Sequence, residues 1–409
     1  HRRSGDAGTT SAALMYQYFA DHYSWNLGVL MAVQLGGELT EIDSACRPLR
    51  PLAEQPGARD DPRAQSAWVG AWSGLAARLQ GFAARDEAAG HLWSAGRKYR
   101  RACIYWFTAE RMTSHRVPEK LGRYVAMVEC FEKSVRLRSR PIEFVAIPYE
   151  GTTLSALFHR APQAGPRPAM IHFDGFDVTK EWMSLSGIAE EFALRGVSTL
   201  MLDHPGIGAA LRVQGLSMNH DSERWARAAM DWLERRDDVD HARVGVIAMS
   251  LGGYYAPRAA AFEPRLACCV AWGARWDNAG SHGRILRDAS AARSVTGWVD
   301  HALWYYGAAT VDEAETKISQ MTLEGVIDKV TCPLLVVHGA GDRQVPFDQA
   351  ERTVREAVRS KQATLRVFDH DEGGVEHVNG DLFSVAIDAM ADWVADALRP
   401  ADAPQRIAA

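Results

Sequence analysis

The stretch Val244-Gly-Val-Ile-Ala-Met-Ser-Leu-Gly-Gly-Tyr-Tyr-Ala-Pro-Arg-Ala-Ala260 decides the fold of this chain. Its first residues form an apolar, largely β-branched run, which is typical of a strand buried on both faces. Small residues then open a helix, so Ser250 lies in a tight turn between strand and helix, the arrangement of a nucleophile elbow. Such a turn needs small residues two positions before and after the serine. Gly252 meets this requirement, and Ala248 stands where glycine is usual.

Strands and helices alternate on both sides of this turn. We expect strands at 142–147, 153–158, 168–173, 197–202, 244–247, 266–272, 334–338 and 363–368, and helices at 181–195, 222–235, 347–360 and 382–398. This alternation implies right-handed crossovers and a mostly parallel sheet. The first two strands are joined by the turn Pro148-Tyr-Glu-Gly151 and add an antiparallel edge hairpin. The order of elements is that of an α/β-hydrolase fold.

Two helical regions stand outside this alternation. Residues 1–139 show helical periodicity, as in the recurrence of Trp68, Trp72, Leu75 and Leu79, and are predicted to form an N-terminal cap region. Residues 274–329 are predicted to form a helical cap insertion at the edge of the sheet where sites of such folds lie. The hydrolase core then comprises 140–273 and 330–400, with a tail at 401–409. We expect the two helical regions to enclose an apolar pocket, with most aromatic residues of the insertion packing its helices together.

Composition excludes several classes of partner. The chain has 409 residues and a formal net charge of -5, which argues against binding to nucleic acid or an anionic membrane. It contains no apolar run long enough to span a bilayer. The six cysteines form no C-x-x-C pair and are interpreted as reduced, buried thiols of a cytoplasmic protein. No metal-ligand cluster is recognisable, so neither metal nor cofactor is expected, and a homodimer is compatible with the sequence.

A serine needs a base to take its proton, and the base needs an acid to orient it. In this fold the partners follow the serine in the order acid, then histidine. Asp342 lies at the tip of a Gly-rich loop after the strand 334–338, although it could simply cap that loop. Two histidines follow the last strand. His377 is preferred because its Gly-containing loop can reach the serine, whereas His370 lies among acidic residues directly after the strand.

An oxyanion would be held by two backbone N–H groups. The N–H of Leu251, at the start of the helix after the serine, is one candidate. The second is expected from the loop after the strand 168–173, where Phe176 is best placed and Gly175 is the alternative. Trp276 in the insertion and Gly175 in the loop after the strand 168–173 are candidate substrate contacts.

Several motifs together resemble one family. They are Pro148-Tyr-Glu-Gly-Thr-Thr-Leu154, Phe173-Asp-Gly-Phe-Asp-Val-Thr-Lys-Glu181, Asp203-His-Pro-Gly-Ile-Gly208, Ser250-Leu-Gly-Gly-Tyr-Tyr-Ala-Pro-Arg-Ala-Ala260 and Glu376-His-Val-Asn-Gly-Asp381. They are similar to the α/β-hydrolases typified by 2,6-dihydroxypseudooxynicotine hydrolase and the fungal polyketide-shortening heptaketide hydrolase. The resemblance extends from about residue 95 to 398. It implies C–C bond or ester hydrolysis beneath a helical cap, the triad Ser250, Asp342 and His377, and an extra acidic pocket residue for which Asp277 is the candidate. Ala248 and the aromatic insertion depart from the family pattern.

The sequence thus predicts a serine hydrolase that cleaves a C–C bond next to a carbonyl in an aromatic ketone or polyketide-like small molecule. The same residues would serve an esterase, a thioesterase or a polyketide-tailoring cyclase or acyltransferase. A third hypothesis is a ligand-binding protein on a hydrolase fold that has lost catalysis; the presence of all three triad residues argues against it.

Overall fold

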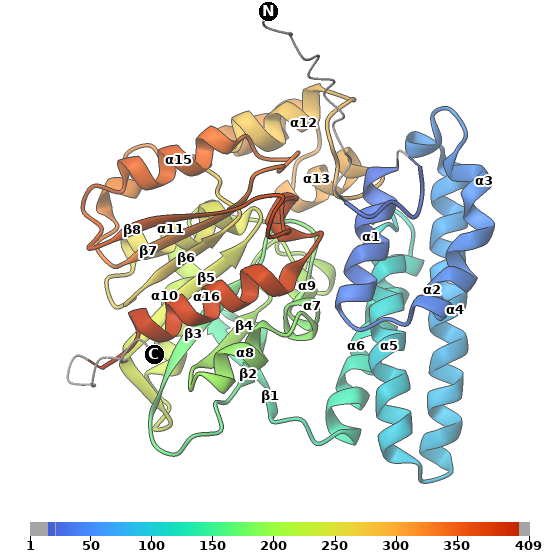
Figure 1. Cartoon of the computed structure of the whole chain (residues 1–409), viewed down its shortest axis with the longest axis horizontal. Helices are drawn as coiled ribbons and strands as arrows, with labels where there is room; N and C mark the ends of the chain where they lie inside the picture. Colours follow the sequence, from blue (N-terminus) through green and yellow to red (C-terminus); the bar gives the residue numbers. More distant parts are fainter. Residues whose placement is uncertain (1–14, 21, 401–409) are drawn as a thin grey trace, which may run out of the picture.

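The computed structural model describes residues 15–20 and 22–400, and its centre is an eight-stranded sheet (Figure 1). The strand order is β1-β2-β4-β3-β5-β6-β7-β8, with β1, β2 and β4 paired antiparallel and the remaining neighbours parallel. The strands are β1 (Ile142–Tyr149), β2 (Thr152–His159), β3 (Arg167–Phe173), β4 (Ser198–Leu202), β5 (Val239–Met249), β6 (Cys269–Trp272), β7 (Leu334–Gly339) and β8 (Ala363–Phe368). The predicted α/β-hydrolase fold, with its antiparallel edge hairpin, is confirmed.

Helices cover both faces of the sheet. Helices α8 and α16 pack against each other on one face, and α10 and α11 pack together on the other (Figure 1). The core helices are α7 (Lys180–Leu185), α8 (Ile188–Leu194), α9 (Gly208–Arg212), α10 (Glu223–Leu233), α11 (Gly252–Phe262), α15 (Phe347–Glu356) and α16 (Phe383–Ala397). The prediction of a single helix at 181–195 is wrong. Gly187 adopts a φ of +89° and separates α7 from α8.

Residues 22–137 are largely helical and form a bundle beside the sheet (Figure 1). Its helices are α1 (Tyr23–Gln34), α2 (Leu39–Cys46), α3 (Arg50–Ala53), α4 (Pro62–Ala88), α5 (Leu92–Arg111) and α6 (Glu119–Leu137). Of the three longest helices, α5 packs against both α4 and α6, and the predicted tryptophan face of α4 is buried. Trp68 stacks on Trp25 of α1 with ring centroids 4.9 Å apart, which joins the first helix to the bundle.

Between β6 and β7 the chain forms a largely helical insertion. It contains a short π-helical turn (Ala279–Gly283), α12 (Arg284–Arg287), α13 (Trp298–Tyr306) and α14 (Val311–Ser319). The predicted tail at 401–409 and the first fourteen residues of the predicted cap region lie outside the described residues. All six cysteines are unpaired and buried.

Within residues 15–20 and 22–400, no three His, Cys, Asp or Glu side chains lie close enough together to hold a metal ion. No helix in the same part of the chain is long and apolar enough to cross a membrane.

Candidate active site

Ser250 lies between β5 and α11, in the predicted sharp turn. Its φ is +62°, a left-handed conformation that costs a non-glycine residue free energy and exposes its side chain at the sheet edge. A Cβ on Gly252 would lie 2.5 Å from the Cβ of Ala248. The elbow therefore accommodates Ala248, two positions before the serine, because Gly252, two positions after it, has no side chain.

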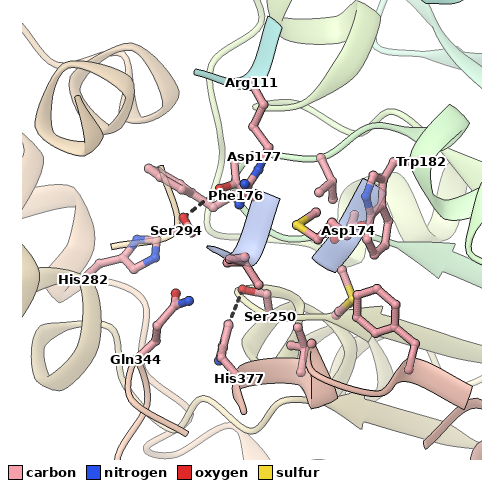
Figure 2. A pocket seen from close by; sticks show the side chains of 17 residues that line it. Arg111, Asp174, Phe176, Asp177, Trp182, Ser250, His282, Ser294, Gln344 and His377 are labelled. Atoms are coloured by element: carbon pink, nitrogen blue, oxygen red, sulfur yellow. Dashed lines mark hydrogen bonds and ion pairs between the residues drawn. The ribbon is translucent and has the colours of Figure 1, made fainter. Parts of the chain in front are cut away.

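The three predicted triad residues form one line of hydrogen bonds. Ser250 Oγ lies 2.8 Å from His377 Nε2 (Figure 2). On the other side of the imidazole ring, His377 Nδ1 lies 2.7 Å from Asp342 Oδ2. This geometry lets one ring nitrogen accept the serine proton while the other donates to the carboxylate. His370 is exposed immediately after β8.

Asp342 is held as a carboxylate. Its Oδ1 accepts hydrogen bonds from the backbone N–H groups of Gln344 and Val345, at 2.8 and 2.9 Å. Burial raises the pKa of Asp342, but the neighbouring His377 and these hydrogen bonds outweigh burial and lower the pKa to about 2. The side chain therefore stays ionised across the neutral range and can stabilise an imidazolium.

The His377 loop is fixed by residues that the sequence analysis did not single out. Asp381 accepts hydrogen bonds from three successive backbone N–H groups, those of Gly374, Val375 and Glu376. Asn379, at a φ of +58°, accepts a hydrogen bond from Trp272 Nε1. The signal for both was present in the sequence, since Asn and Asp beside a glycine are typical of backbone turns that their side chains stabilise.

The loop after β3 packs directly on the serine turn. A Cβ on Gly175 would lie 2.9 Å from Leu251 N, so this approach requires glycine. The Gly175 N–H already donates to Asp174 Oδ1 at 2.6 Å. The N–H groups of Leu251 and Phe176 have no acceptor among the described residues. Both can therefore donate to an oxygen at the serine, which favours Phe176 over Gly175 as the second oxyanion donor.

The pocket beside Ser250 has two unlike sides (Figure 2). Polar side chains, among them Arg111, Asp177 and His282, line one side. Trp182, Phe383 and several aliphatic and methionine side chains line the other side, where Asp174 also lies next to Trp182. Leu27 and Met31 of α1 and Arg111 of α5 belong to the wall, so the N-terminal helices contribute to the pocket.

Three predicted substrate contacts do not line this pocket. Asp277 turns its carboxylate back to accept the N–H of Gly280, and Trp276 is buried against Arg352. Gly175 contributes its close packing on the turn but no lining atom. The insertion reaches the pocket instead through His282 and Ser294.

The aromatic residues of the insertion pack around Phe176. Its ring lies 5.1 Å from Trp298 and 5.0 Å from Tyr305, measured between ring centroids. His282 meets the same ring edge-on at 4.7 Å, and its Nδ1 lies 2.7 Å from Tyr306 Oη. Trp298, Tyr305 and Tyr306 do not line the pocket, so they support the loop that carries the Phe176 N–H, whereas His282 both packs on Phe176 and lines the pocket. No periodicity marked His282 or Ser294 in the sequence.

The chain matches two family models. The model described as Esterase FrsA-like matches residues 65–289, more than half of the chain, and the model of the prolyl oligopeptidase family matches residues 226–399. Among curated proteins, 2,6-dihydropseudooxynicotine hydrolase of Paenarthrobacter nicotinovorans is 29% identical over 352 residues, covering 84% of this chain and 87% of that protein. The 20-hydroxy-prefusarin hydrolase of Gibberella moniliformis is 27% identical over 312 residues, covering 67% and 73%.

Among solved structures, that of 2,6-dihydroxy-pseudo-oxynicotine hydrolase superposes with a TM-score of 0.72 at 25% identity, covering 90% of this chain and 95% of the other. The likeness therefore includes the helical bundle as well as the sheet. The relatives are named hydrolases, and the fold superposes on the solved hydrolase structure. The chain is a hydrolase and belongs to the FrsA-like esterase family of α/β-hydrolases.

Proposed function

We propose that this protein is a serine hydrolase that cleaves a C–C bond adjacent to a carbonyl in an aromatic ketone or polyketide-like small molecule. The observation that carries the proposal is the hydrogen-bonded line from Ser250 through His377 to Asp342, which opens on a pocket with one polar and one apolar side. The apolar side suits a hydrocarbon or aryl group, and the polar side suits an oxygenated one.

The chemistry follows from the geometry. Ser250 Oγ attacks the carbonyl carbon while His377 Nε2 takes the hydroxyl proton, and the Asp342 carboxylate stabilises the resulting imidazolium. The N–H groups of Leu251 and Phe176 hold the oxyanion. When the tetrahedral intermediate collapses, the bond to the leaving group breaks and His377 returns its proton to that group. Water, deprotonated by His377, then hydrolyses the acyl-enzyme and frees Ser250.

A carbon leaving group adds one requirement to this scheme. The departing carbon takes the electron pair of the broken bond, so it must be stabilised as an enolate by a second carbonyl. A 1,3-diketone meets the requirement, because one carbonyl is attacked and the other receives the charge. Relatives of this chain are named for oxygenated substrates, 2,6-dihydropseudooxynicotine and 20-hydroxy-prefusarin, and these names support a substrate rich in oxygen.

The alternative is hydrolysis of an ester or thioester by the same residues. The match to an esterase family model supports this alternative, so the experiment compares a ketone with an ester. Purified protein would be given 1-phenylbutane-1,3-dione or phenyl butanoate, with both fragments detected by mass spectrometry. The proposal expects cleavage of the diketone at a higher kcat/KM than the ester, and no cleavage by Ser250→Ala. Turnover of the ester alone would establish the alternative. Turnover of neither would favour a ligand-binding protein.

A further inference from the structure

One charged pair in the pocket wall has no place in the chemistry described above. Arg111, the last residue of α5, donates through Nη2 to Asp177 Oδ2 at 2.9 Å. The side chains are only 4% and 11% exposed. Ser294, from the insertion, donates to the same Asp177 oxygen at 2.7 Å. Three segments far apart in the sequence therefore meet on the polar side of the pocket (Figure 2).

Both partners have unused hydrogen-bonding capacity. A guanidinium has several N–H donors, yet Nη2 alone has a partner among the described residues, and the buried Nε has none. On Asp177, Oδ2 accepts two hydrogen bonds, whereas no described residue donates to Oδ1. Buried polar groups are nearly always satisfied because an unmade hydrogen bond inside a protein is costly. A charged pair that lines the pocket and is left incomplete therefore points to a ligand group that completes it.

The charges define that group. Burial raises the pKa of Asp177, but the Arg111 charge and the Ser294 hydrogen bond outweigh burial and hold the pKa below its usual value. The pair is thus a cation beside an anion. An anionic group placed against Arg111 would also lie next to the Asp177 carboxylate and would be repelled by its negative charge. A neutral hydroxyl avoids this repulsion, since it can accept from Arg111 and donate to Asp177 at the same time.

We propose that Arg111 and Asp177 form a subsite for a neutral hydroxyl group on the substrate, so that the enzyme selects hydroxylated over unsubstituted aromatic ketones. The inference rests on the proposed function for the identity of the ketone, but it concerns binding and not the reaction. The two sides of the pocket then bind different parts of the substrate. The hydroxylated ring lies against the ion pair, and the apolar portion lies against Trp182 and Phe383.

The test uses Ser250→Ala, which keeps the ligand intact, and calorimetric titration with three ketones of one scaffold. They are 1-(2,4-dihydroxyphenyl)butan-1-one, the unsubstituted 1-phenylbutan-1-one, and the anionic 4-butanoylbenzoate. Because charge-assisted hydrogen bonds discriminate strongly against a ligand that lacks the partner, the dihydroxy ketone should bind at least about tenfold more tightly than either of the others.

Adding Asp177→Asn or Arg111→Met to Ser250→Ala should reduce this preference to about twofold or less, since one partner of the hydroxyl is lost or altered. Arg116→Gln is the matched control, because Arg116 is a largely exposed arginine near the same helix end that does not line the pocket. It should leave the preference unchanged. Thermal melting checks that each variant is folded, and where a variant is not, the comparison of the three ketones decides alone.

Equal binding of the dihydroxy and unsubstituted ketones would overturn the proposal, as would absence of binding by all three. Tightest binding of the benzoate would show an anion site instead and would also overturn it. Failure of the proposed reaction is seen separately, in the turnover assays, because these titrations contain no active nucleophile.

Discussion

The sheet edge and the helical bundle build the same pocket by different means. At the sheet edge, Ser250 and Asp342 lie in short turns after β5 and β7, and His377 lies in the longer loop between β8 and α16. Hydrogen bonds within these loops do most of the positioning. In the bundle, Leu27 and Arg111 lie on long helices whose positions are set by packing against the core. The chemical groups are thus encoded locally, whereas the wall that meets the substrate is encoded by tertiary contacts.

Buried charges hold the bundle in place. Glu110 of α5 pairs with Lys120 of α6 at 2.9 Å and with Arg212 of α9 at 2.7 Å, and all three side chains are at most 4% exposed. Since α9 belongs to the core, this cluster ties the bundle to the sheet beside the Arg111 subsite. The carboxylate is shared by two cations, so breaking it would leave buried positive charge without compensation.

The largest loss of activity is expected from a substitution at the sheet edge. Changing His377 to alanine removes the only group hydrogen-bonded to Ser250 Oγ among the described residues, so kcat should fall by at least about a thousandfold. His370→Ala is the control and should change kcat less than about twofold, because that side chain is exposed after β8. The reverse result would show that the other histidine acts as the base.

Removing residues 1–138 tests the bundle as a whole. If its helices form the pocket wall, the truncated protein should either be insoluble or lose kcat/KM for 1-phenylbutane-1,3-dione at least about tenfold more than for a short ester, 4-nitrophenyl acetate. The comparison of two substrates separates loss of the wall from loss of the triad. A soluble truncation with unchanged kcat/KM for both substrates would show that the bundle is not part of the site.

The charged cluster is tested by Glu110→Gln. This change leaves Lys120 and Arg212 buried without their shared carboxylate, so we expect a loss of about 3 kcal/mol in the free energy of unfolding, measured in urea. Glu119→Gln is the control, because Glu119 is exposed at the start of α6. A loss below about 0.5 kcal/mol for Glu110→Gln would mean that the cluster does not hold the bundle to the core.

The same cluster predicts an acid limit. Burial raises the pKa of Glu110, but Arg212 and Lys120 outweigh burial and lower the pKa to about 2 from an ordinary value of 4.5. Its contribution to stability is therefore complete above pH 4.5 and is lost as the pH falls toward 2. The melting temperature of Glu110→Gln should depend less on pH across this interval than that of the parent protein. An unchanged pH dependence would assign the acid sensitivity to other carboxylates, such as Asp342.

A smaller effect is expected where the two regions touch. Gln34, the last residue of α1, donates to the Gly380 carbonyl at 2.7 Å and accepts from the Phe383 N–H at 2.6 Å, which supports the His377 loop. Gln34→Ala should lower kcat about threefold to tenfold with little change in KM, because the loop loses its support and not its base. Gln55→Ala, at an exposed position, should have no effect. Equal values for both variants would show that the bundle does not position the histidine.

The difference between the sheet-edge loops and the packed helices also explains which site residues could be predicted from the sequence. Asp342 and His377 could be predicted because each lies in a Gly-containing loop that follows a recognisable strand. Trp276 and Asp277 do not line the pocket, because the orientation of a side chain in an insertion depends on what it packs against. Arg111 carried no signal, because an arginine in the last turn of a helix is favourable whether or not a pocket lies beside it. The break between α7 and α8 could have been predicted from Gly187, because a glycine inside an apparently continuous helix often ends it.

Covalent labelling shows directly whether Ser250 is the nucleophile. Diisopropyl fluorophosphate should add to the intact protein once, and peptide mapping by mass spectrometry should place the adduct on Ser250. His377→Ala should be labelled at least about a hundredfold more slowly, because the hydroxyl has lost its base. Ser250→Ala should not be labelled. An adduct on another residue, or equal labelling of Ser250→Ala, would show that Ser250 is not the nucleophile.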